Sequence, residues 1–230
     1  MPTVVHQRRP SCVSGLRRRL VVDDSSPVTT PDEVTIAGMP MPLCWLRPPR
    51  DWRATDSQLT IEADGATDWF ADPADPARVL TAAPVLLGRA GGDFLLSARV
   101  TVAFGSVFDA GALMLHVDDG CWAKLCLEYS PQEEPMIVSV VTSGSSDDAN
   151  GVVLSGRDAW LRIARIGPAF AFHASRDGAR WQLVRHFRLG ASGEPGVGFE
   201  AQSPTGDGCV VTFDEIRFEQ RRLTDLRGGS

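Results

Sequence analysis

The sequence predicts an all-β fold, an antiparallel sandwich or barrel, on the basis of three observations. Short segments in which apolar and polar residues alternate recur from residue 58 to residue 219, which is the period-2 pattern of half-buried strands. No window of about 10–12 residues follows the 3.6-residue period of an amphipathic helix. Turn-forming residues are plentiful, with 22 Gly and 16 Pro. A length of 230 residues and a hydrophobic fraction of 43% suit one domain of this class.

Three segments are predicted along the chain. Residues 1–38 lack sustained periodicity and are rich in Arg, Ser, Thr, Pro and Asp, so we expect a disordered basic and polar extension. Residues 39–220 hold all the alternating segments and are predicted to form the single β-sandwich domain. Residues 221–230 are basic and glycine-rich, and we expect a frayed tail there.

Each strand is predicted from its own pattern. Residues 93–104 are the clearest case, since every second residue from Phe94 to Phe104 is apolar. Residues 136–143 are nearly all apolar and β-branched, as in a central strand, whereas residues 144–151 (GSSDDANG) are interpreted as a polar loop. The predicted strands, in order, are 58–62, 84–88, 93–104, 112–117, 122–129, 136–143, 160–166, 170–175, 181–188, 196–201 and 209–219.

A hairpin over residues 108–129 is the stretch around which the other strands are arranged. A turn at Asp118–Gly120 would bring Val117 opposite Cys121 and His116 opposite Trp122. A slip of one residue would mix the two faces, so the pattern itself favours this register. One face would enter the core and the other would be free for contacts. The contact face is predicted to hold Met114, His116, Trp122, Lys124, Cys126 and Glu128.

Charge and cysteine usage limit the possible partners and the compartment. The chain has a net charge of −6, and residues 1–20 hold five arginines and no acid, so the remainder is strongly acidic. An acidic body disfavours nucleic-acid binding, and no stretch approaches the ~18 apolar residues of a membrane helix. Five cysteines without a C-x-x-C pair are interpreted as reduced thiols, which favours a cytoplasmic location.

No cofactor and no metal site are predicted. The glycine-rich segments 88–92 and 190–198 lack both the spacing and the following helix of a nucleotide-binding loop. The acidic residues of segment 144–151 could bind calcium, but such a loop is more often simply solvated, so this question stays open.

A set of short motifs follows one another in order along the chain. They are Thr67-Asp68-Trp69-Phe70, Phe108-Asp109, Leu113-Met114, Trp122, Lys124, Glu128-Tyr129, Ser139–Thr142 and Ser146-Asp147. With these motifs the chain resembles a family of uncharacterised domains whose fungal member is described as a regulation-of-enolase protein. The chain departs from the family pattern at Trp69-Phe70, where the two aromatic residues are exchanged, at Ala110–Ala112, where the family has Gln-Ala-Gly, and at Asp148, where it has Trp. The resemblance covers about residues 45–219 and implies a concanavalin-A-like (jelly-roll) β-sandwich, without bringing a settled activity.

The candidate site residues follow from the hairpin face and these motifs. Glu128 and Lys124 are predicted as catalytic residues, with Asp109 as a further carboxyl. Glu128 and Lys124 are four residues apart on one strand, which is about 13 Å at ~3.3 Å per residue. They would therefore bind two ends of a ligand, or each would pair with a residue of a neighbouring strand. An outer sheet face held by salt bridges is the structural alternative. The predicted ligand-binding residues are Trp122, His116, Asp68, Trp69 and Asp147, whereas Trp160 and Trp181 are expected in the core.

Three functions stay open at this level. The first is a cytoplasmic module that binds a carbohydrate or a small polar metabolite on its concave sheet face. The second is an enzyme, a hydrolase or isomerase on a sugar-like or other polar substrate, with Glu128 as general acid or base and Lys124 stabilising negative charge. The third, a regulatory partner of a metabolic enzyme, rests on the family resemblance alone.

Overall fold

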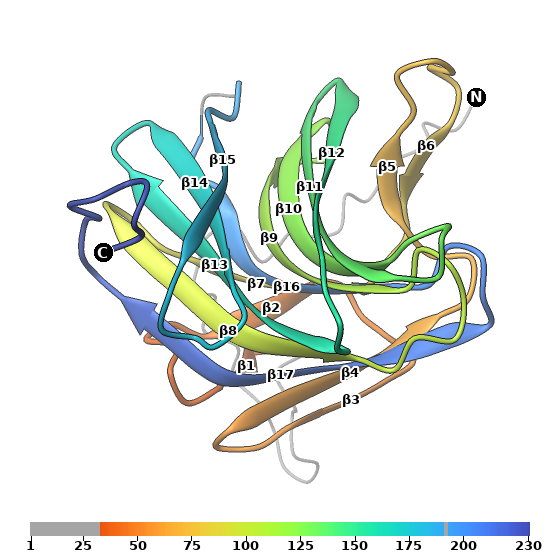
Figure 1. Ribbon diagram of the computed structural model, residues 1–230, viewed down its shortest axis with the longest axis horizontal. Helices are drawn as coiled ribbons and strands as arrows, with labels where there is room; N and C mark the ends of the chain where they lie inside the picture. Colours follow the sequence, from red (N-terminus) through yellow and green to blue (C-terminus); the bar gives the residue numbers. More distant parts are fainter. Residues whose placement is uncertain (1–32, 191–192) are drawn as a thin grey trace, which may run out of the picture.

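The computed structural model describes residues 33–190 and 193–230, and within these ranges the regular structure is entirely β. Two large antiparallel sheets pack face to face, and a separate two-stranded hairpin stands beside them (Figure 1). The strands are β1 Glu33–Val34, β2 Leu43–Arg47, β3 Asp51–Ala54, β4 Gln58–Asp64, β5 Trp69–Ala71, β6 Val79–Thr81, β7 Val85–Arg89, β8 Phe94–Val102, β9 Ala110–Asp118, β10 Cys121–Tyr129, β11 Pro135–Ser143, β12 Ser145–Val153, β13 Asp158–Ile166, β14 Ala169–Ser175, β15 Gln182–Phe187, β16 Gly196–Gln202 and β17 Gly208–Glu219.

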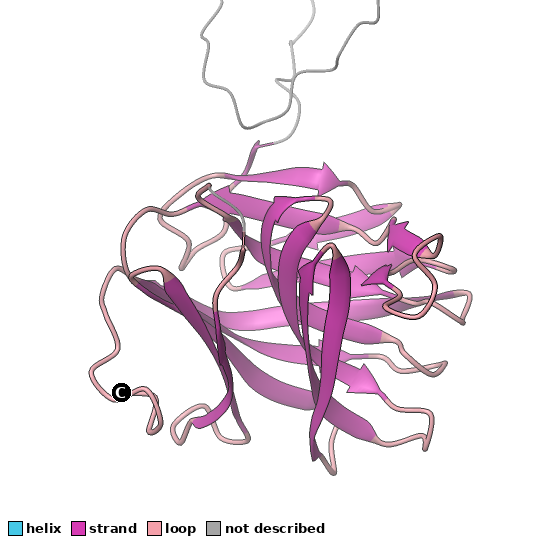
Figure 2. Ribbon diagram, turned by 90° about the horizontal axis from the view of Figure 1, so that it is seen from above, coloured by secondary structure: helices cyan, strands magenta, loops and turns pink. Residues whose placement is uncertain are grey.

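The predicted sandwich is confirmed. The first sheet has the order β1-β2-β7-β16-β9-β10-β11-β12 and the second has the order β15-β14-β13-β8-β17-β4-β3. Figure 2 shows the strands of both sheets from above, with loops connecting them and a C-terminal segment without regular structure. The main core lies between the inner faces, where residues such as Leu125 and Phe199 of the first sheet meet Val100 and Phe213 of the second.

The central hairpin has the predicted faces. His116 lies opposite Trp122, Met114 opposite Lys124 and Leu113 opposite Leu125. The register at the turn differs from the prediction, because Cys121 pairs with Asp118 and a bulge separates this pair from the rest of the ladder. The aliphatic residues of the hairpin enter the core between the sheets, and the other face forms a second buried cluster on the outer side of the first sheet.

Six strands escaped the sequence prediction for identifiable reasons. The short strands β1, β2, β3, β5 and β6 carry too few residues for a period-2 pattern, and prolines or acidic loops flank most of them. Strand β12 was interpreted as a loop, which is wrong. It is an edge strand whose residues are almost all exposed, so it has no apolar face to reveal it.

The structure also differs from the expected segment boundaries. Strand β1 pairs with β2 although it lies before residue 39, and residues 1–32 lie outside the described residues. The segment 221–230, expected to be frayed, packs against the second sheet through the buried Leu223. Apolar burial, which the basic composition conceals, holds this segment in place.

The cysteines follow the prediction only in part. Cys121, Cys126 and Cys209 are free and buried, whereas Cys44 is disulfide-bonded, so the prediction of reduced thiols is wrong for Cys44. Among the described residues no helix has the length and apolar character needed to cross a membrane.

The packing at Gly111 yields a stability prediction. A Cβ at this position would lie 2.4 Å from Val211 Cγ1 and 2.7 Å from Val100 Cγ1, inside the core between the sheets. We expect Gly111→Ala to destabilise the protein by about 1–3 kcal/mol through overpacking. Gly105→Ala is the matched control, because its Cβ would meet only Asp109 Oδ2 at 3.7 Å. Urea unfolding of both variants checks this, and equal midpoints would contradict it.

Candidate functional site

Lys124 is the centre of the outer face of the first sheet. It projects from β10 between Met114 and Val140, its neighbours across the ladders, and its side chain is only 2% exposed. Its ammonium group lies 3.0 Å from Asp68 Oδ1, just before β5, and donates a hydrogen bond to Gln202 Oε1 at the end of β16. One lysine thus joins three segments that are distant in sequence.

The Lys124 ammonium stays charged although it is buried. Burial opposes the charged form, but the negative charges of Asp68 and Glu200 outweigh it and raise the pKa of Lys124 above its ordinary value. An ammonium group carries three N–H donors, and two of them are engaged by Asp68 and Gln202. Among the described residues the ammonium group has no third hydrogen-bond partner, and Lys124 lines a cavity.

Glu200 is a buried carboxyl that the sequence analysis missed. It lies on β16 between Ala112 and Val85, it is 0% exposed, and neither of its oxygens has a hydrogen-bond partner within the described ranges. Burial raises the pKa of Glu200 to about 7, against the opposing effect of Lys124. Its position two residues before Gln202 places both side chains on one face, which is the only sequence signal that could have revealed it.

Glu128 is the second carboxyl with a raised pKa on this face. It follows Lys124 by four residues on β10 and is half-buried. Burial raises the pKa of Glu128 to about 8, with Lys124 opposing the shift. At neutral pH this carboxyl therefore holds its proton and can donate a hydrogen bond. No ion pair forms between Glu128 and Lys124, in agreement with their separation along the strand.

A cavity of about 480 Å³ lies over Lys124 and Glu128. One wall comes from the outer face of the first sheet, a second from the β5–β6 hairpin, and a third from the segments around residues 108 and 204. The hairpin is fastened to this face because the Ala71 N–H donates to Ser146 Oγ of β12. The lining residues are Asp68, Phe70, Arg78, Leu80, Phe108, Lys124, Glu128, Pro131, Met136, Val138, Val140, Asp148, Asn150, Gln202, Pro204 and Thr205.

Phe108 enters this lining with an unusual backbone. Its φ of 68° lies in the left-handed region that bulky residues rarely adopt. Two hydrogen bonds hold it there, from its N–H to Tyr129 O and from Gln202 Nε2 to its own carbonyl oxygen. Strain of this kind persists where the surroundings over-determine it, and binding sites are among the places where it clusters.

The predicted aromatic residues lie beside the cavity and not in its wall. Trp69 and Trp122 meet edge to face with ring centroids 5.8 Å apart, and Trp69 packs in the same way on His116 at 5.2 Å. Both indoles are buried, and Trp69 Nε1 donates to Ala83 O. The Lys124 ammonium lies 5.8 Å from the centroid of the Trp122 ring, so the aromatic cluster stabilises the lysine through a cation–π contact. Burial lowers the pKa of His116.

Two predicted carboxyl groups are engaged elsewhere. Asp109 is fully buried, and it accepts hydrogen bonds from the amides of Gly105 and Ser106 and from Ser203 Oγ. It therefore shapes the loop before β9. Asp147 lies on the opposite face of β12 from the cavity and forms a 2.8 Å ion pair with Arg185 of the second sheet.

The neighbours of Asp147 take its expected place. Asp148 and Asn150 of β12 line the cavity, because successive residues of a strand point to opposite faces. The interpretation of this segment as a loop concealed that alternation. Among the described residues no group of three or more His, Cys, Asp or Glu side chains could hold a metal ion. Trp160 and Trp181 are only half-buried and stack on Arg99 and Arg162, so their expected place in the core is wrong.

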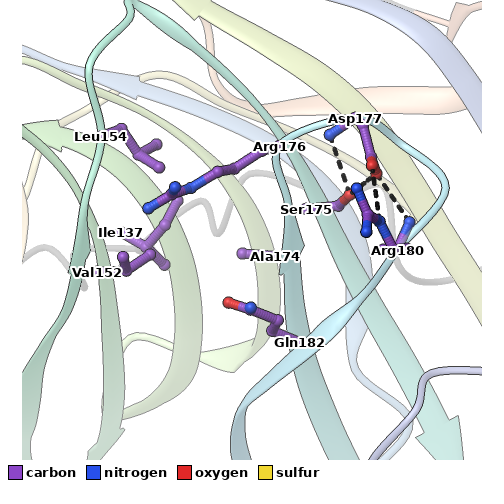
Figure 3. A pocket seen from close by; sticks show the side chains of 9 residues that line it. All are labelled: Ile137, Val152, Leu154, Ala174, Ser175, Arg176, Asp177, Arg180 and Gln182. Atoms are coloured by element: carbon purple, nitrogen blue, oxygen red, sulfur yellow. Dashed lines mark hydrogen bonds and ion pairs between the residues drawn. The ribbon is translucent and has the colours of Figure 1, made fainter.

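A smaller cavity of about 200 Å³ lies at the open edge between β12 and β14 (Figure 3). The carboxylate of Asp177 points away from it toward Ser175 and Arg180, and the Arg176 side chain extends across to Val153 O. Its polar groups are mostly satisfied by one another. The larger cavity, with an unused lysine donor, is the better candidate site.

The fold and this cavity define a β-sandwich protein whose candidate site, a mostly apolar cavity with a few polar groups, lies on the outer face of one sheet. Residues 45–221 match the family model described as "Protein of unknown function (DUF1349)". The chain therefore belongs to this family, and the resemblance seen in the sequence is confirmed.

Individual relatives agree with this assignment. The chain is 30% identical over 177 residues to "Regulation of enolase protein 1" of Saccharomyces cerevisiae, covering 74% of this chain and 86% of the relative. It is 29% identical to the crystal structure of a functionally unknown protein from Saccharomyces cerevisiae, with a TM-score of 0.72 over 79% of this chain and 97% of that one. The carbohydrate-binding module CBM66 from Bacillus subtilis gives a TM-score of 0.51 at 17% identity, covering 82% and 99%, which shows the fold alone.

The buried Glu200 yields a prediction for the pH dependence of stability. Its pKa in the folded protein, about 7, lies above its ordinary value of 4.5. The folded protein therefore retains a proton that the unfolded chain releases, and stability falls as pH rises from about 4.5 to 7. At 1.36 kcal/mol per pKa unit, this carboxyl lowers the free energy of unfolding by roughly 3 kcal/mol as pH rises. We expect Glu200→Gln, which cannot ionise, to abolish this decrease.

Urea unfolding at pH 5 and pH 8 measures the effect. The exposed Glu134→Gln serves as the control variant and should keep the pH dependence of the unchanged protein. Equal pH dependence in Glu200→Gln and the unchanged protein would contradict the expected role of this carboxyl.

Proposed function

We propose that this protein binds a carbohydrate or another small polar, hydroxylated metabolite in the cavity over Lys124. The observation that carries the proposal is the buried Lys124 ammonium, which lines the cavity with one N–H donor unused. A buried donor without a partner is unfavourable, so the site favours a ligand that brings an oxygen to it.

The remaining lining suits the same ligand class. The protonated Glu128 adds a second donor, while Asp68, Asp148 and Asn150 supply acceptors on other sides of the cavity. The apolar side chains, Phe70 among them, offer surface for C–H groups. A mostly apolar pocket with a few convergent polar groups is typical of small-molecule sites, and about 480 Å³ lies within their usual size range.

The similarity to the CBM66 module is compatible with a sugar ligand but supports it only as a fold-level analogy.

Asp147 and Asp148 provide a matched test, since the same substitution can be made on opposite faces of one strand. A thermal-shift screen against sugars, sugar phosphates, glycolytic intermediates and calcium comes first. A ligand present at about 100 times its Kd adds about 2.7 kcal/mol of stability. We expect Asp148→Ala to weaken binding of the hit about tenfold, and Asp147→Ala to leave affinity unchanged. Equal affinities in both variants, measured by calorimetry, would remove Asp148 from the site.

An enzyme that uses Glu128 as a general acid is the second candidate function. A carboxyl whose pKa is raised to about 8 keeps its proton at neutral pH and can transfer it to a leaving oxygen, while Lys124 stabilises negative charge nearby. We expect Glu128→Gln to retain ligand affinity within a few-fold and to reduce any turnover of the hit by about 10²-fold or more. Turnover is measured by analysis of the product. Full activity in Glu128→Gln would contradict this candidate function.

A regulatory role toward a metabolic enzyme remains a prediction, supported by the name of the yeast relative. A ligand screen without hits would favour it over small-molecule binding. The cytoplasmic location likewise remains a prediction, to be tested by cell fractionation.

A further inference from the structure

Part of the outer face of the second sheet is covered by the chain itself. After β17 the chain turns back, and residues 221–230, here called the cover segment, pack at one end of β8, β13 and β14 (Figure 1, dark blue). Leu223 is buried against Leu95, Ala164 and Ala171. The segment forms a loop held by internal hydrogen bonds, because the amides of residues 224 and 225 both donate to Ser230 O.

Two nitrogen-bearing side chains are buried beneath this segment. Arg162 of β13 and His173 of β14 are cross-strand partners, with exposed fractions of 7% and 0%. Arg162 Nη1 donates to Gly229 O at 2.5 Å, and His173 Nε2 lies 2.7 Å from Leu226 O. The guanidinium carbon of Arg162 lies 3.6 Å from the centroid of the Trp181 ring. Both of these polar contacts from the sheet to the cover segment are thus made to backbone carbonyls.

The cation in this arrangement is incompletely satisfied. No carboxylate lies within ion-pair distance of Arg162 in the described part of the chain, and its Nε has no hydrogen-bond partner. His173 Nδ1 also lacks a partner. Glu219 acts on Arg162 only from beyond ion-pair distance, and Arg221 adds a positive charge nearby. A buried charge without a close counter-charge is unfavourable, and the one carbonyl that Arg162 contacts, Gly229 O, replaces only part of the missing interaction.

These groups have the chemistry of an oxyanion site. A planar guanidinium stacked on an aromatic ring is well suited to carboxylate and phosphate groups, whose oxygens accept its fork of donors. The carbonyl oxygens of Leu226 and Gly229 already accept from His173 and Arg162, so they stand in for two oxygens of such a group.

We propose that Arg162, His173 and Trp181 form a binding site for a small oxyanion, a carboxylate or a phosphate group, and that the cover segment occupies this site until the anion displaces it. The site lies on the sheet opposite the cavity over Lys124 and is independent of the function proposed for that cavity.

A substitution at Gly229 can displace the cover segment from the proposed site in the full chain. It has a φ of +72°, and an added Cβ would lie 2.6 Å from Trp181 Cβ. Because a site that is open only part of the time binds with reduced apparent affinity, Gly229→Leu should bind inorganic phosphate or acetate about tenfold more tightly or better than the unchanged protein. Calorimetric titration with each anion separately tells the two chemistries apart.

The controls separate the site from the cover. Adding Arg162→Gln to Gly229→Leu should abolish the gain, and Arg227→Ala, an exposed change within the cover segment, should leave binding as in the unchanged protein. Circular dichroism and the thermal midpoint establish that each variant is folded. A folded Gly229→Leu that binds neither anion more tightly overturns the proposal.

The unchanged protein gives a second test that does not depend on any variant. The amide of Gly229 donates to Asp225 O, and those of Thr224 and Asp225 donate to Ser230 O. Displacement of the cover by a bound anion should accelerate hydrogen exchange of these amides, with β13 and β14 unaffected. Exchange rates in the cover segment that stay constant up to about 100 mM phosphate and acetate would overturn the proposal.

Discussion

The ion pair between the buried Lys124 and Asp68 is the interaction on which the candidate site depends. A buried ammonium group needs a counter-charge and hydrogen-bond acceptors, so its presence on β10 requires Asp68 and Gln202 to come to it. Asp68 directly precedes β5, and the ion pair therefore fixes where the β5–β6 hairpin begins. That hairpin supplies one wall of the cavity, and the Trp69 and Trp122 rings pack behind the lysine. The ion pair acts together with the apolar cluster on this face, in which Trp69 and Trp122 are buried.

The electrostatics around Lys124 set the chemistry of the cavity near neutral pH. Burial raises the pKa of Glu128 and of Glu200, to about 8 and about 7, while the lysine remains charged. Glu128 lines the cavity, so it changes from a hydrogen-bond donor to an acceptor as pH rises through about 8. Glu200 is fully buried and affects the cavity only through its charge near Lys124. A ligand whose recognition depends on accepting hydrogen bonds would be held best on the acidic side of this range.

Each outer face of the sandwich holds a buried cation, and the two cations are stabilised in different ways. Antiparallel sheets commonly leave one face in water, yet here each outer face has a buried cation beneath a covering segment. Lys124 lies under the β5–β6 hairpin and is paired with a carboxylate, whereas Arg162 lies under residues 221–230, where it donates to a carbonyl and stacks on an indole. The first arrangement is complete as a structure and leaves one donor for a ligand. In the second, no carboxylate of the described residues forms an ion pair with Arg162, which is the physical basis for the anion site proposed there.

The sequence by itself determined the all-β class, eleven of the strands and the two faces of the central hairpin, because period-2 alternation is a local property that burial imposes on each strand. It also placed Lys124, Glu128 and Asp68 among the site residues. Only the tertiary structure decided which carboxyl groups meet at the lysine. Glu200 and Asp148 come to the site through strand order and through an exposed edge strand that has no apolar pattern, and Asp109 is drawn into a loop by three hydrogen bonds. Pairing between distant strands depends on the packing of the whole sandwich, which no local pattern records.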